Sequence, residues 1–359
     1  MGEILRPRAE SIFNDELQAL KQEDSKPRPP SWLLSPHAVV QYLMGATLSD
    51  GTIISPKYIG SRRLIEVAVA TLATDRALLL VGVPGTAKTW VAEHLAAAIS
   101  GHSGYLVQGS AGIGEEALKY TWNYARLLSH GPDRESLVPS PVFHAMEQGL
   151  LVRIEEFTRF PAEVLDELIT VLSEKIMPIP ELNDTLQAKN GFNLIATAND
   201  RDRGINELSG ALRRRFNMVY MPLPETMEEE ILIIKNRVEQ SIKKLGMESF
   251  PTPTEEIKRI VTIFRELRNG QTIDGQQKLK SPSSTLSTAE AIEVVYSGQM
   301  LAYHFGNGQL KATDIAAALS GAIVKDTHND LPIWKDYLQL VVKDRDGWKD
   351  LYRACRELL

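Results

Sequence analysis

Apolar and polar residues follow two different patterns along the chain, and the change falls at Pro222-Leu223-Pro224. Before this junction, short apolar runs of strand length alternate with helical patterns, which predicts a parallel sheet with crossover helices. The apolar runs are Ala77–Val81, Tyr105–Gln108, Gly149–Ile154, Phe192–Ala198 and Met218–Met221. After the junction, amphipathic helical patterns follow one another with no strand between them. These patterns are Glu225–Lys244, Thr254–Arg268, Thr288–Phe305 and Thr313–Val324. We therefore expect an α/β core followed by a small all-helical domain.

The same patterns divide the chain into four parts. The first is a peripheral N-terminal extension that contains a helical pattern, Phe13–Lys21, and a charged, proline-rich linker. The core then opens with a helix that Ser35 caps and Pro36 begins, and a further helical pattern covers Leu64–Leu72. Two more helices, Pro332–Val342 and Trp348–Leu358, close the chain. The expected bounds are 1–35 for the extension, 36–224 for the core, 225–325 for the helical domain and 326–359 for the closing helices.

One strand-to-helix junction carries the clearest chemistry. The run Ala77–Val81 leads into Gly82-Val83-Pro84-Gly85-Thr86-Ala87-Lys88-Thr89, and a helical pattern follows to Ser100. The glycines let the backbone curl so that successive N–H groups point at phosphate oxygens. Lys88 can reach the β- and γ-phosphates of a nucleoside triphosphate, the Thr89 hydroxyl can coordinate Mg²⁺, and the helix directs its positive end at the same anion. The alternative is a glycine-rich turn that binds no ligand.

Ala87 departs from the general form of this motif, which has glycine immediately before the lysine. Alanine disfavours a positive φ, so we expect Ala87 to take a right-handed conformation as the helix begins. A right-handed residue at this position is compatible with phosphate binding.

Composition narrows the class of protein. The chain has 359 residues, of which 43% are hydrophobic and 24% charged, as in a soluble globular protein of two packed domains. The net charge of −6 gives no bulk electrostatic reason to expect nucleic-acid binding. A single cysteine, Cys355, excludes an internal disulfide framework and suits a reducing cytoplasm. No segment approaches ~18 uninterrupted apolar residues, and Met1–Glu10 lacks a signal-peptide core, so we expect no membrane span and a cytoplasmic location.

Polar residues with suitable chemistry follow the later strands. The run Leu150–Ile154 leads into Glu155 and Glu156, of which one can orient the hydration shell of Mg²⁺ while the other polarises a water. Neighbours on a strand point to opposite sides, which would separate the two carboxylates. Alone, the pair reads equally well as a charged surface turn. The run Phe192–Ala198 ends at Asn199, which can hold the attacking water or serve as an ordinary turn residue.

Three arginines, Arg213-Arg214-Arg215, precede the last strand. Such a triplet by itself is better read as a solvated face or a contact for an acidic partner. In their order and spacing, however, the pieces resemble the AAA+ ATPases, and among them the MoxR-type branch of the helix-2-insert clade. The resemblance covers about Lys57 to Phe305, and Ala87 before the lysine is typical of that branch. It implies Walker A at Gly82–Thr89, Walker B at Glu155-Glu156, sensor 1 at Asn199, an arginine finger at Arg215 with Arg214 as fallback, and an adenine pocket at Tyr58-Ile59-Gly60.

The resemblance also assigns two inserts and makes two departures visible. A long stretch between Gln108 and Gly149 contains Tyr120-Thr121-Trp122-Asn123-Tyr124, whose alternating aromatics would share one face of a strand. In this clade such an insert points to the channel of a ring, although a small hairpin with inward aromatics is an equal alternative. A second hairpin is expected over 175–190. Walker B here lacks its usual aspartate, and Ser287-Thr288-Ala289-Glu290 stands where Ser-Pro-Arg would supply sensor 2 in the lid. Arg265 and Arg268 are candidate substitutes.

The implied function is ATP hydrolysis, with ATP and Mg²⁺ bound between the α/β core and the helical lid. The resemblance implies a ring, a hexamer, in which a neighbour supplies the arginine finger. It further implies a chaperone-like remodeller that acts with a partner bearing a von Willebrand factor A domain. An alternative from another class is a nucleotide-gated scaffold with slow or incidental hydrolysis. A nucleic-acid motor ranks third, since the arginine triplet is the only evident basic feature.

Overall fold

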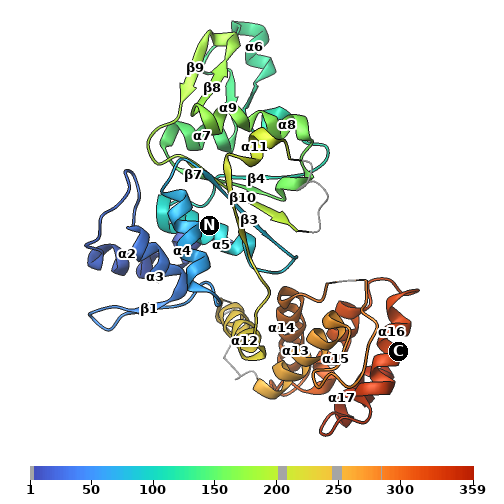
Figure 1. The fold of residues 1–359 in the computed structure, drawn as a ribbon. Helices are drawn as coiled ribbons and strands as arrows, with labels where there is room; N and C mark the ends of the chain where they lie inside the picture. The colour runs from blue at the N-terminus through green and yellow to red at the C-terminus, as the bar shows by residue number, and fades with distance from the viewer. Residues whose placement is uncertain (1–3, 201–207, 245–252, 284) are drawn as a thin grey trace. The chain divides into compact units, whose positions relative to one another are not determined.

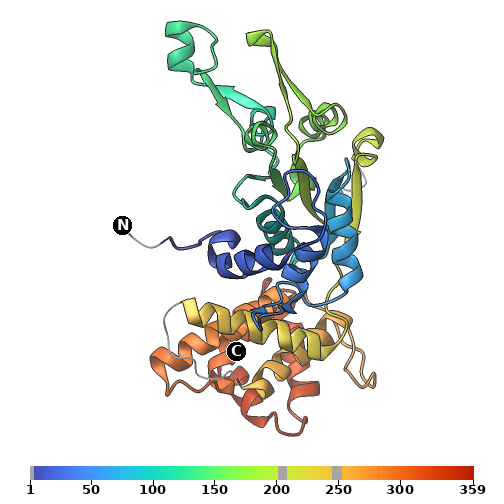
Figure 2. The ribbon, with the colours of Figure 1, turned by 90° about the vertical axis from the view of Figure 1, so that its left-hand side faces the viewer.

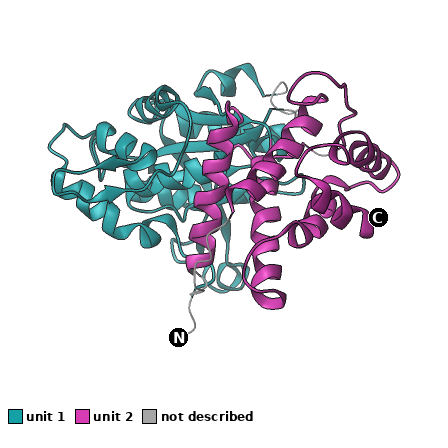
Figure 3. Ribbon diagram, turned by 90° about the horizontal axis from the view of Figure 1, so that it is seen from below, with its two compact units in different colours: residues 1–83, 87–221 teal, residues 84–86, 222–359 magenta. Residues whose placement is uncertain are grey.

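The computed structural model describes residues 4–200, 208–244, 253–283 and 285–359, and they form two compact units (Figure 3). Unit 1 comprises residues 1–83 and 87–221, and unit 2 comprises residues 84–86 and 222–359. The main division follows Met221, at the proline-flanked junction where the sequence pattern changes. The fold is α/β, with a parallel sheet in unit 1, followed by a helical region.

A five-stranded parallel sheet forms the centre of unit 1 (Figure 1). All five apolar runs form its strands, as predicted, and the strand order is β11-β3-β10-β7-β4. The bounds are β3 Ala77–Gly82, β4 Leu106–Gln108, β7 Leu151–Glu155, β10 Asn193–Asn199 and β11 Phe216–Tyr220. Because the strands are parallel, their carboxyl ends lie along one edge of the sheet.

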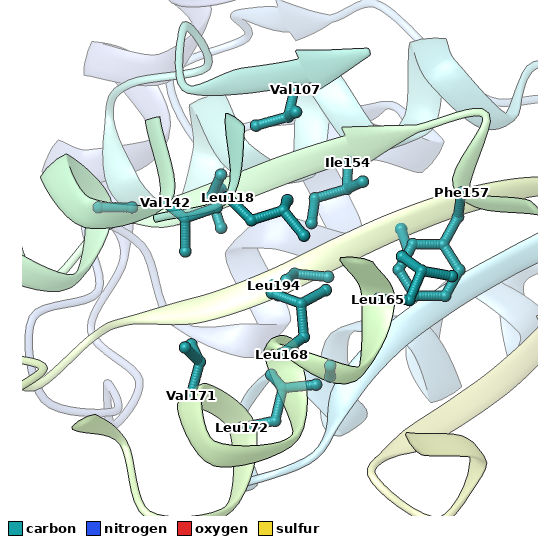
Figure 4. Close-up of a cluster of buried hydrophobic side chains, with 14 of the residues drawn as sticks. Val107, Leu118, Val142, Ile154, Phe157, Leu165, Leu168, Val171, Leu172 and Leu194 are labelled. Carbon is teal, nitrogen blue, oxygen red and sulfur yellow. The ribbon is translucent and has the colours of Figure 1, made fainter. Parts of the chain in front are cut away.

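Alternate residues of each strand enter two different hydrophobic cores, one on each face of the sheet. In β3, Leu79 and Val81 join the first core, whereas Leu78 and Leu80 join the second. The first core contains residues of α7 Pro141–Gln148, α8 Ala162–Asp166 and α9 Leu168–Ser173 together with Ile154 and Phe157 (Figure 4). The second core contains buried apolar residues of α3 Pro36–Met44, α4 Arg62–Leu72 and α5 Lys88–Ser100. Burial on both faces explains why these strands read as continuous apolar runs.

The helices of unit 1 begin and end close to their predicted bounds. Ser35 caps α3, because its hydroxyl accepts a hydrogen bond from the Ala38 N–H at 3.2 Å, and Pro36 takes the first helical position, as predicted. Two short strands outside the main sheet, β1 Ala46–Thr47 and β2 Ile53–Ile54, form a small antiparallel ribbon. The helices are α1 Ala9–Ile12, α2 Asn14–Glu23, α3 Pro36–Met44, α4 Arg62–Leu72, α5 Lys88–Ser100, α6 Tyr124–His130, α7 Pro141–Gln148, α8 Ala162–Asp166, α9 Leu168–Ser173 and α11 Gly210–Arg213.

The N-terminal segment is not peripheral, contrary to the sequence prediction. Leu17, Leu20 and Leu34 are buried in the second core. Asp24, within the proline-rich linker, accepts hydrogen bonds from the Ser35 N–H and hydroxyl, both at 2.7 Å. Burial raises the pKa of Asp24, but these bonds outweigh burial and hold it below its usual value. The charged linker suggested a solvated tether, whereas the apolar residues on either side of it anchor the segment.

Two hairpins project from unit 1 at the same end (Figure 2). In the first, β5 Tyr120–Trp122 pairs with β6 Leu137–Pro139, with α6 between them. In the second, β8 Ile176–Ile179 pairs with β9 Asp184–Gln187, which confirms the hairpin predicted over 175–190. The Tyr120 hydroxyl donates to the Glu181 carboxylate at 2.8 Å, and Arg134 pairs with Asp184 at 2.6 Å. These two contacts tie the hairpins to each other.

The aromatics of the first hairpin do not share one face. Tyr120 and Trp122 are partly buried against the first core, with ring centroids 5.8 Å apart in an edge-to-face arrangement. Asn123 ends the strand, because its side chain accepts from the Arg126 N–H and caps α6. Tyr124 therefore begins a helix and is 69% exposed. The inward-packing alternative is right for two of the three aromatics, and the single-strand prediction is wrong for the third.

Unit 2 is helical in the part that the structure describes, with one hydrophobic core. Its core contains buried residues from the four predicted helices and also from the closing helices, including Trp334 and Val342. The helices are α12 Met227–Lys244, α13 Thr254–Asn269, α14 Thr288–Phe305, α15 Ala312–Ile323, α16 Asp330–Tyr337, which continues as a π-helical turn over Leu338–Val342, and α17 Lys349–Glu357. Across the described ranges, no helix combines the length and apolar character that crossing a membrane requires.

Candidate functional site

The predicted phosphate loop connects an inner strand of the sheet to a largely buried helix. β3 ends at Gly82 and α5 begins at Lys88. The Lys88 ammonium turns back into the loop and donates to the Gly82 and Val83 carbonyls at 2.8 and 2.9 Å. Gly85 adopts φ +81°, a left-handed conformation in which glycine carries no steric penalty. The loop thus has the curled backbone and the interior lysine that phosphate binding requires.

Ala87 takes a left-handed conformation, so the prediction of a right-handed residue is wrong. It lies at φ 62°, ψ 18°, in the N-cap position of α5. For a residue with a Cβ atom this region costs roughly 1–2 kcal/mol. The loop requires the reversal at this point whatever residue occupies it, because the backbone must turn from the strand into the helix. Geometry of the loop here overrides the local preference of alanine.

The structure brings Asn199 and Glu156 together beside this loop. β10 lies between β3 and β7, and Asn199 is in register with Gly82. The Asn199 side-chain amide donates to the Glu156 carboxylate at 3.3 Å. Both side chains therefore lie at the carboxyl edge of the sheet, next to the start of the phosphate loop. An amide that donates to a carboxylate fixes its direction, which suits a group that accepts a proton from water.

The two adjacent carboxylates are separated by a turn of the backbone and not by strand alternation alone. β7 ends at Glu155, and Glu156 adopts φ 53° as the N-cap of the 3₁₀ turn Phe157–Arg159. A left-handed non-glycine residue costs about 1–3 kcal/mol and is concentrated at functional positions. The two carboxylates have different partners, Arg153 for Glu155 and Asn199 for Glu156, while the sequence prediction attributed their separation to the pleat of a strand.

Glu155 is buried and already holds a cationic partner. Its carboxylate accepts from the Arg153 guanidinium at 2.6 Å, and both side chains are more than nine-tenths buried. Burial lowers the pKa of Arg153, while the Glu155 and Glu93 carboxylates oppose that shift. Arg153 was missed by the sequence reasoning, although a lone arginine inside the apolar run Leu150–Ile154 was the signal that could have revealed it.

The oxygen donors near the loop fit Mg²⁺. Thr89 lies in the first turn of α5 with its side chain exposed, and Glu155 ends the neighbouring strand β7. Protein sites for Mg²⁺ with nucleotides use one or two protein oxygens together with phosphates and waters. No cluster of three or more acidic, histidine or cysteine side chains suited to a metal occurs among the residues that the structure describes.

Arg214 and Arg215 of the arginine triplet differ in exposure and in their hydrogen-bond partners. The Arg215 guanidinium donates to the Ser173 hydroxyl at 2.6 Å and to the Ala211 carbonyl at 2.7 Å, within unit 1. Arg214 is exposed, and its side chain makes no hydrogen bond or ion pair with any residue in the described ranges. Its backbone is engaged: the N–H donates to the Gly210 carbonyl at 3.4 Å, and the carbonyl accepts from Arg76 at 2.9 Å. Arg215, the first choice for the finger, is thus committed locally, while the fallback Arg214 is not.

The segment Tyr58-Ile59-Gly60 is tied to the phosphate-loop helix through Trp90. The Trp90 indole N–H donates to the Lys57 carbonyl at 2.8 Å, directly before this segment. Tyr58 is buried, and Gly60 is exposed at φ 145° with no room for a Cβ atom beside the Tyr58 ring. Trp90 directly follows Thr89 of the predicted phosphate loop. Its side chain therefore links this loop to the segment predicted to line the adenine pocket. The sequence reasoning did not single out Trp90.

The two arginines suggested as sensor 2 substitutes are engaged inside unit 2. Arg265 and Arg268 both pair with the fully buried carboxylate of Glu230, at 2.8 and 3.2 Å. Arg268 also donates to the Leu286 carbonyl at 3.0 Å, and Leu286 adopts a positive φ of 46°. Ser287 and Glu290 form a reciprocal capping box at the start of α14. The residues that replace Ser-Pro-Arg therefore begin a helix, and neither arginine is available in this arrangement.

Comparison with known proteins defines the class. Residues 77–216 match the family model of an AAA domain of the dynein-related subfamily. Residues 228–358 match the model of the YehL-like AAA+ ATPase C-terminal domain. Together with the parallel sheet and its phosphate loop, these matches make the chain an AAA+ protein.

A relative that aligns with almost the whole chain then gives the family. The chain is 39% identical to the uncharacterized protein YehL of Escherichia coli (strain K12), over 99% of this chain and 98% of the relative. The chain therefore belongs to the YehL-like family of AAA+ ATPases. It is 32% identical to the uncharacterized protein YojN of Bacillus subtilis (strain 168), over 43% of this chain and 50% of the relative. NtrX from Brucella abortus in complex with ADP aligns with a TM-score of 0.49 and 13% identity, over 76% of this chain and 58% of that chain.

Proposed function

We propose that this protein is a MoxR-type ATP hydrolase that works as a ring and remodels a protein client. The observation that carries the proposal is the Asn199–Glu156 hydrogen bond at the sheet edge beside Gly82. Glu156 acts as the general base for the attacking water, and Asn199 holds that carboxylate in place. Lys88 and the loop N–H groups bind the phosphates, while Thr89 and Glu155 hold Mg²⁺, which neutralises charge on the β- and γ-phosphates.

The arginine finger is assigned to Arg214 of a neighbouring subunit. An exposed guanidinium with no side-chain partner among the described residues can reach a phosphate on another copy, whereas Arg215 would have to leave two hydrogen bonds. A finger that acts in trans makes the catalytic site incomplete in one subunit. The proposal therefore includes a homo-oligomer, with a hexamer as its expected form, located in the cytoplasm.

Turnover against protein concentration tests the intersubunit site. We expect the ATPase rate per subunit to fall when the protein is diluted below the concentration at which it assembles, followed in parallel by light scattering. A rate per subunit that stays constant through disassembly would contradict a finger supplied in trans.

The client and the partner follow from the MoxR-type resemblance, which favours a protein that carries a von Willebrand factor A domain. A second candidate function is a nucleotide-gated scaffold, in which ATP binding assembles the ring and hydrolysis is slow. The Arg153–Glu155 ion pair favours this candidate, because the metal-side carboxylate is shared with a cation.

The Glu156→Gln variant separates the two functions in an affinity-capture experiment with ATP present. A remodeller loses its effect on the captured client, whereas a scaffold retains both the partner and its effect. Glu163→Gln, on the exposed face of α8, is the matched control. A nucleic-acid motor would instead show salt-dependent binding of DNA or RNA in a mobility-shift assay.

A further inference from the structure

A charged arginine occupies the middle of strand β7, between β10 and β4 in the sheet. Arg153 is 6% exposed, and Glu155, two residues further along, is 7% exposed. Burying a charge is costly unless the charge is both paired and hydrogen-bonded. Here the guanidinium donates to the Glu155 carboxylate at 2.6 Å and to the Ser103 carbonyl at 3.1 Å. A replaceable packing residue would not need this arrangement, so the position of Arg153 calls for a functional explanation.

Arg153 and Glu155 lie on the face of the sheet that α5 covers. Leu151 belongs to the second core, which contains the buried residues of α5. Val152 and Ile154 belong to the first core on the opposite face. Because side chains alternate along a strand, residues 151, 153 and 155 share the α5 face. Thr89 lies in the first turn of that same helix, so both proposed Mg²⁺ donors belong to this side of the sheet.

Glutamate at this position is one methylene longer than the aspartate usual in AAA+ proteins. A longer side chain has more rotamers and reaches further from the strand end. Residues i and i+2 of a strand are about 7 Å apart, within the joint reach of an arginine and a glutamate side chain. The guanidinium therefore draws one oxygen of Glu155 back along the strand.

We propose that Arg153 is a positioning residue for Glu155, and that the two residues together take the place of a single aspartate. The proposal rests on the proposed function, since it assigns Glu155 to the Mg²⁺ side of the nucleotide site. Arg153 limits the rotamers of Glu155 and leaves its second oxygen to act as the donor. The two departures in this strand, arginine at 153 and glutamate at 155, are then one coupled change.

A double-mutant cycle tests the coupling, with Arg153→Met, Glu155→Asp and the double variant. The readout is the Mg²⁺ concentration that half-saturates binding of a fluorescent ATP analogue, measured at equilibrium without turnover. Partners that orient a metal ligand typically alter metal affinity about 10–100-fold. We expect each single variant to raise the half-saturating Mg²⁺ concentration about tenfold, and the double variant to return within about threefold of wild type.

Effects that add in the double variant would overturn the proposal. So would a lower unfolding temperature for Arg153→Met with an unchanged Mg²⁺ requirement, because that pattern marks a purely structural arginine. Should Arg153→Met fail to fold, Arg153→Lys is used instead. Lysine keeps the positive charge but lacks the planar guanidinium that contacts both the Glu155 carboxylate and the Ser103 carbonyl. We expect this variant to need an intermediate Mg²⁺ concentration. Arg63→Met, an exposed arginine of α4, controls for the substitution itself. A wild-type protein that binds the analogue without Mg²⁺ dependence would refute the proposed function instead.

Discussion

One arginine site in each unit illustrates two opposite uses of a guanidinium group. In unit 2, Arg265 and Arg268 converge on one buried carboxylate, Glu230, whose oxygens also accept from the Thr288 hydroxyl at 3.0 Å. In unit 1, Arg214 precedes the last strand with an exposed side chain that no described residue engages. A saturated buried network holds a fold together and resists change, because removing one member leaves an uncompensated charge. An unengaged surface charge adds little to stability and can act on another molecule.

The largest effect that sharpens this comparison is expected from Arg214→Ala. As an arginine finger, Arg214 would contribute about 10³-fold or more to turnover, and its loss would change the free energy of unfolding by less than about 0.5 kcal/mol. Arg215→Ala should cost about 1 kcal/mol of stability through its two lost hydrogen bonds and leave turnover within about tenfold of wild type. Steady-state ATPase assays and urea unfolding measure both variants. The reverse pattern would restore Arg215 as the finger.

Next in size is the effect of Glu230→Gln. Breaking a buried ion pair costs about 3–5 kcal/mol, so the unfolding transition of unit 2 should move to a clearly lower urea concentration. Glu228→Gln, exposed on the same turn of α12, should change stability by less than about 0.5 kcal/mol. Equal effects of the two substitutions would show that the network around Glu230 contributes no more than a surface charge.

A smaller effect, which depends on pH, is expected at Asp330. Burial raises the pKa of this carboxyl group, but bonds from the N–H groups of Ser283, Lys325 and Asp326 outweigh burial and hold it below its usual 3.8. A lowered folded-state pKa adds stability above the unfolded pKa, and this stability is lost as the pH falls through the folded pKa. Asp330→Asn should therefore cost about 2 kcal/mol at pH 7 and progressively less below about pH 4. Urea unfolding of wild type and Asp330→Asn at pH 7 and below about pH 4 checks this expectation. A difference in unfolding free energy between the two proteins that does not change with pH would contradict it.

The smallest effect is expected from Ala87→Gly, which tests strain in unit 1. Ala87 is exposed at a positive φ, so glycine relieves the strain without removing a buried contact. We expect about 1 kcal/mol of added stability in urea unfolding, with ATP affinity within about twofold of wild type. A loss of stability would indicate that the alanine methyl group makes a favourable contact in the loop.

The strands of the sheet could be predicted from the sequence because each strand is buried on both faces and therefore consists of a continuous apolar run. The helices of unit 2 could be predicted for the corresponding reason, since their apolar residues recur at helical spacing. Glu156 and Asn199 were expected at the ends of two apolar runs, whereas the hydrogen bond between them was not predicted. For the strands and the helices a local pattern was sufficient, because the pattern and the tertiary structure agree.

Other features depend on partners that are remote in sequence. The conformation of Ala87 is set by the loop around it and not by its own preference. The N-terminal segment is held by contacts such as the ion pair between Glu16 and Lys57 at 2.5 Å. A local sequence pattern does not predict such a contact, because the partners are far apart in the chain. Arg265 and Arg268 were left open as sensors because their common partner, Glu230, lies on a different helix.

If the residues at the carboxyl edge of the sheet form one ATP-hydrolysing site, the Glu156→Gln variant should bind ATP without hydrolysing it. ATP affinity and phosphate release are measured on the same preparation, with Glu163→Gln as the control. We expect an ATP affinity within about threefold of wild type and a turnover reduced at least about 10²-fold, because only the general base is removed. Turnover equal to that of wild type would show that water is activated elsewhere.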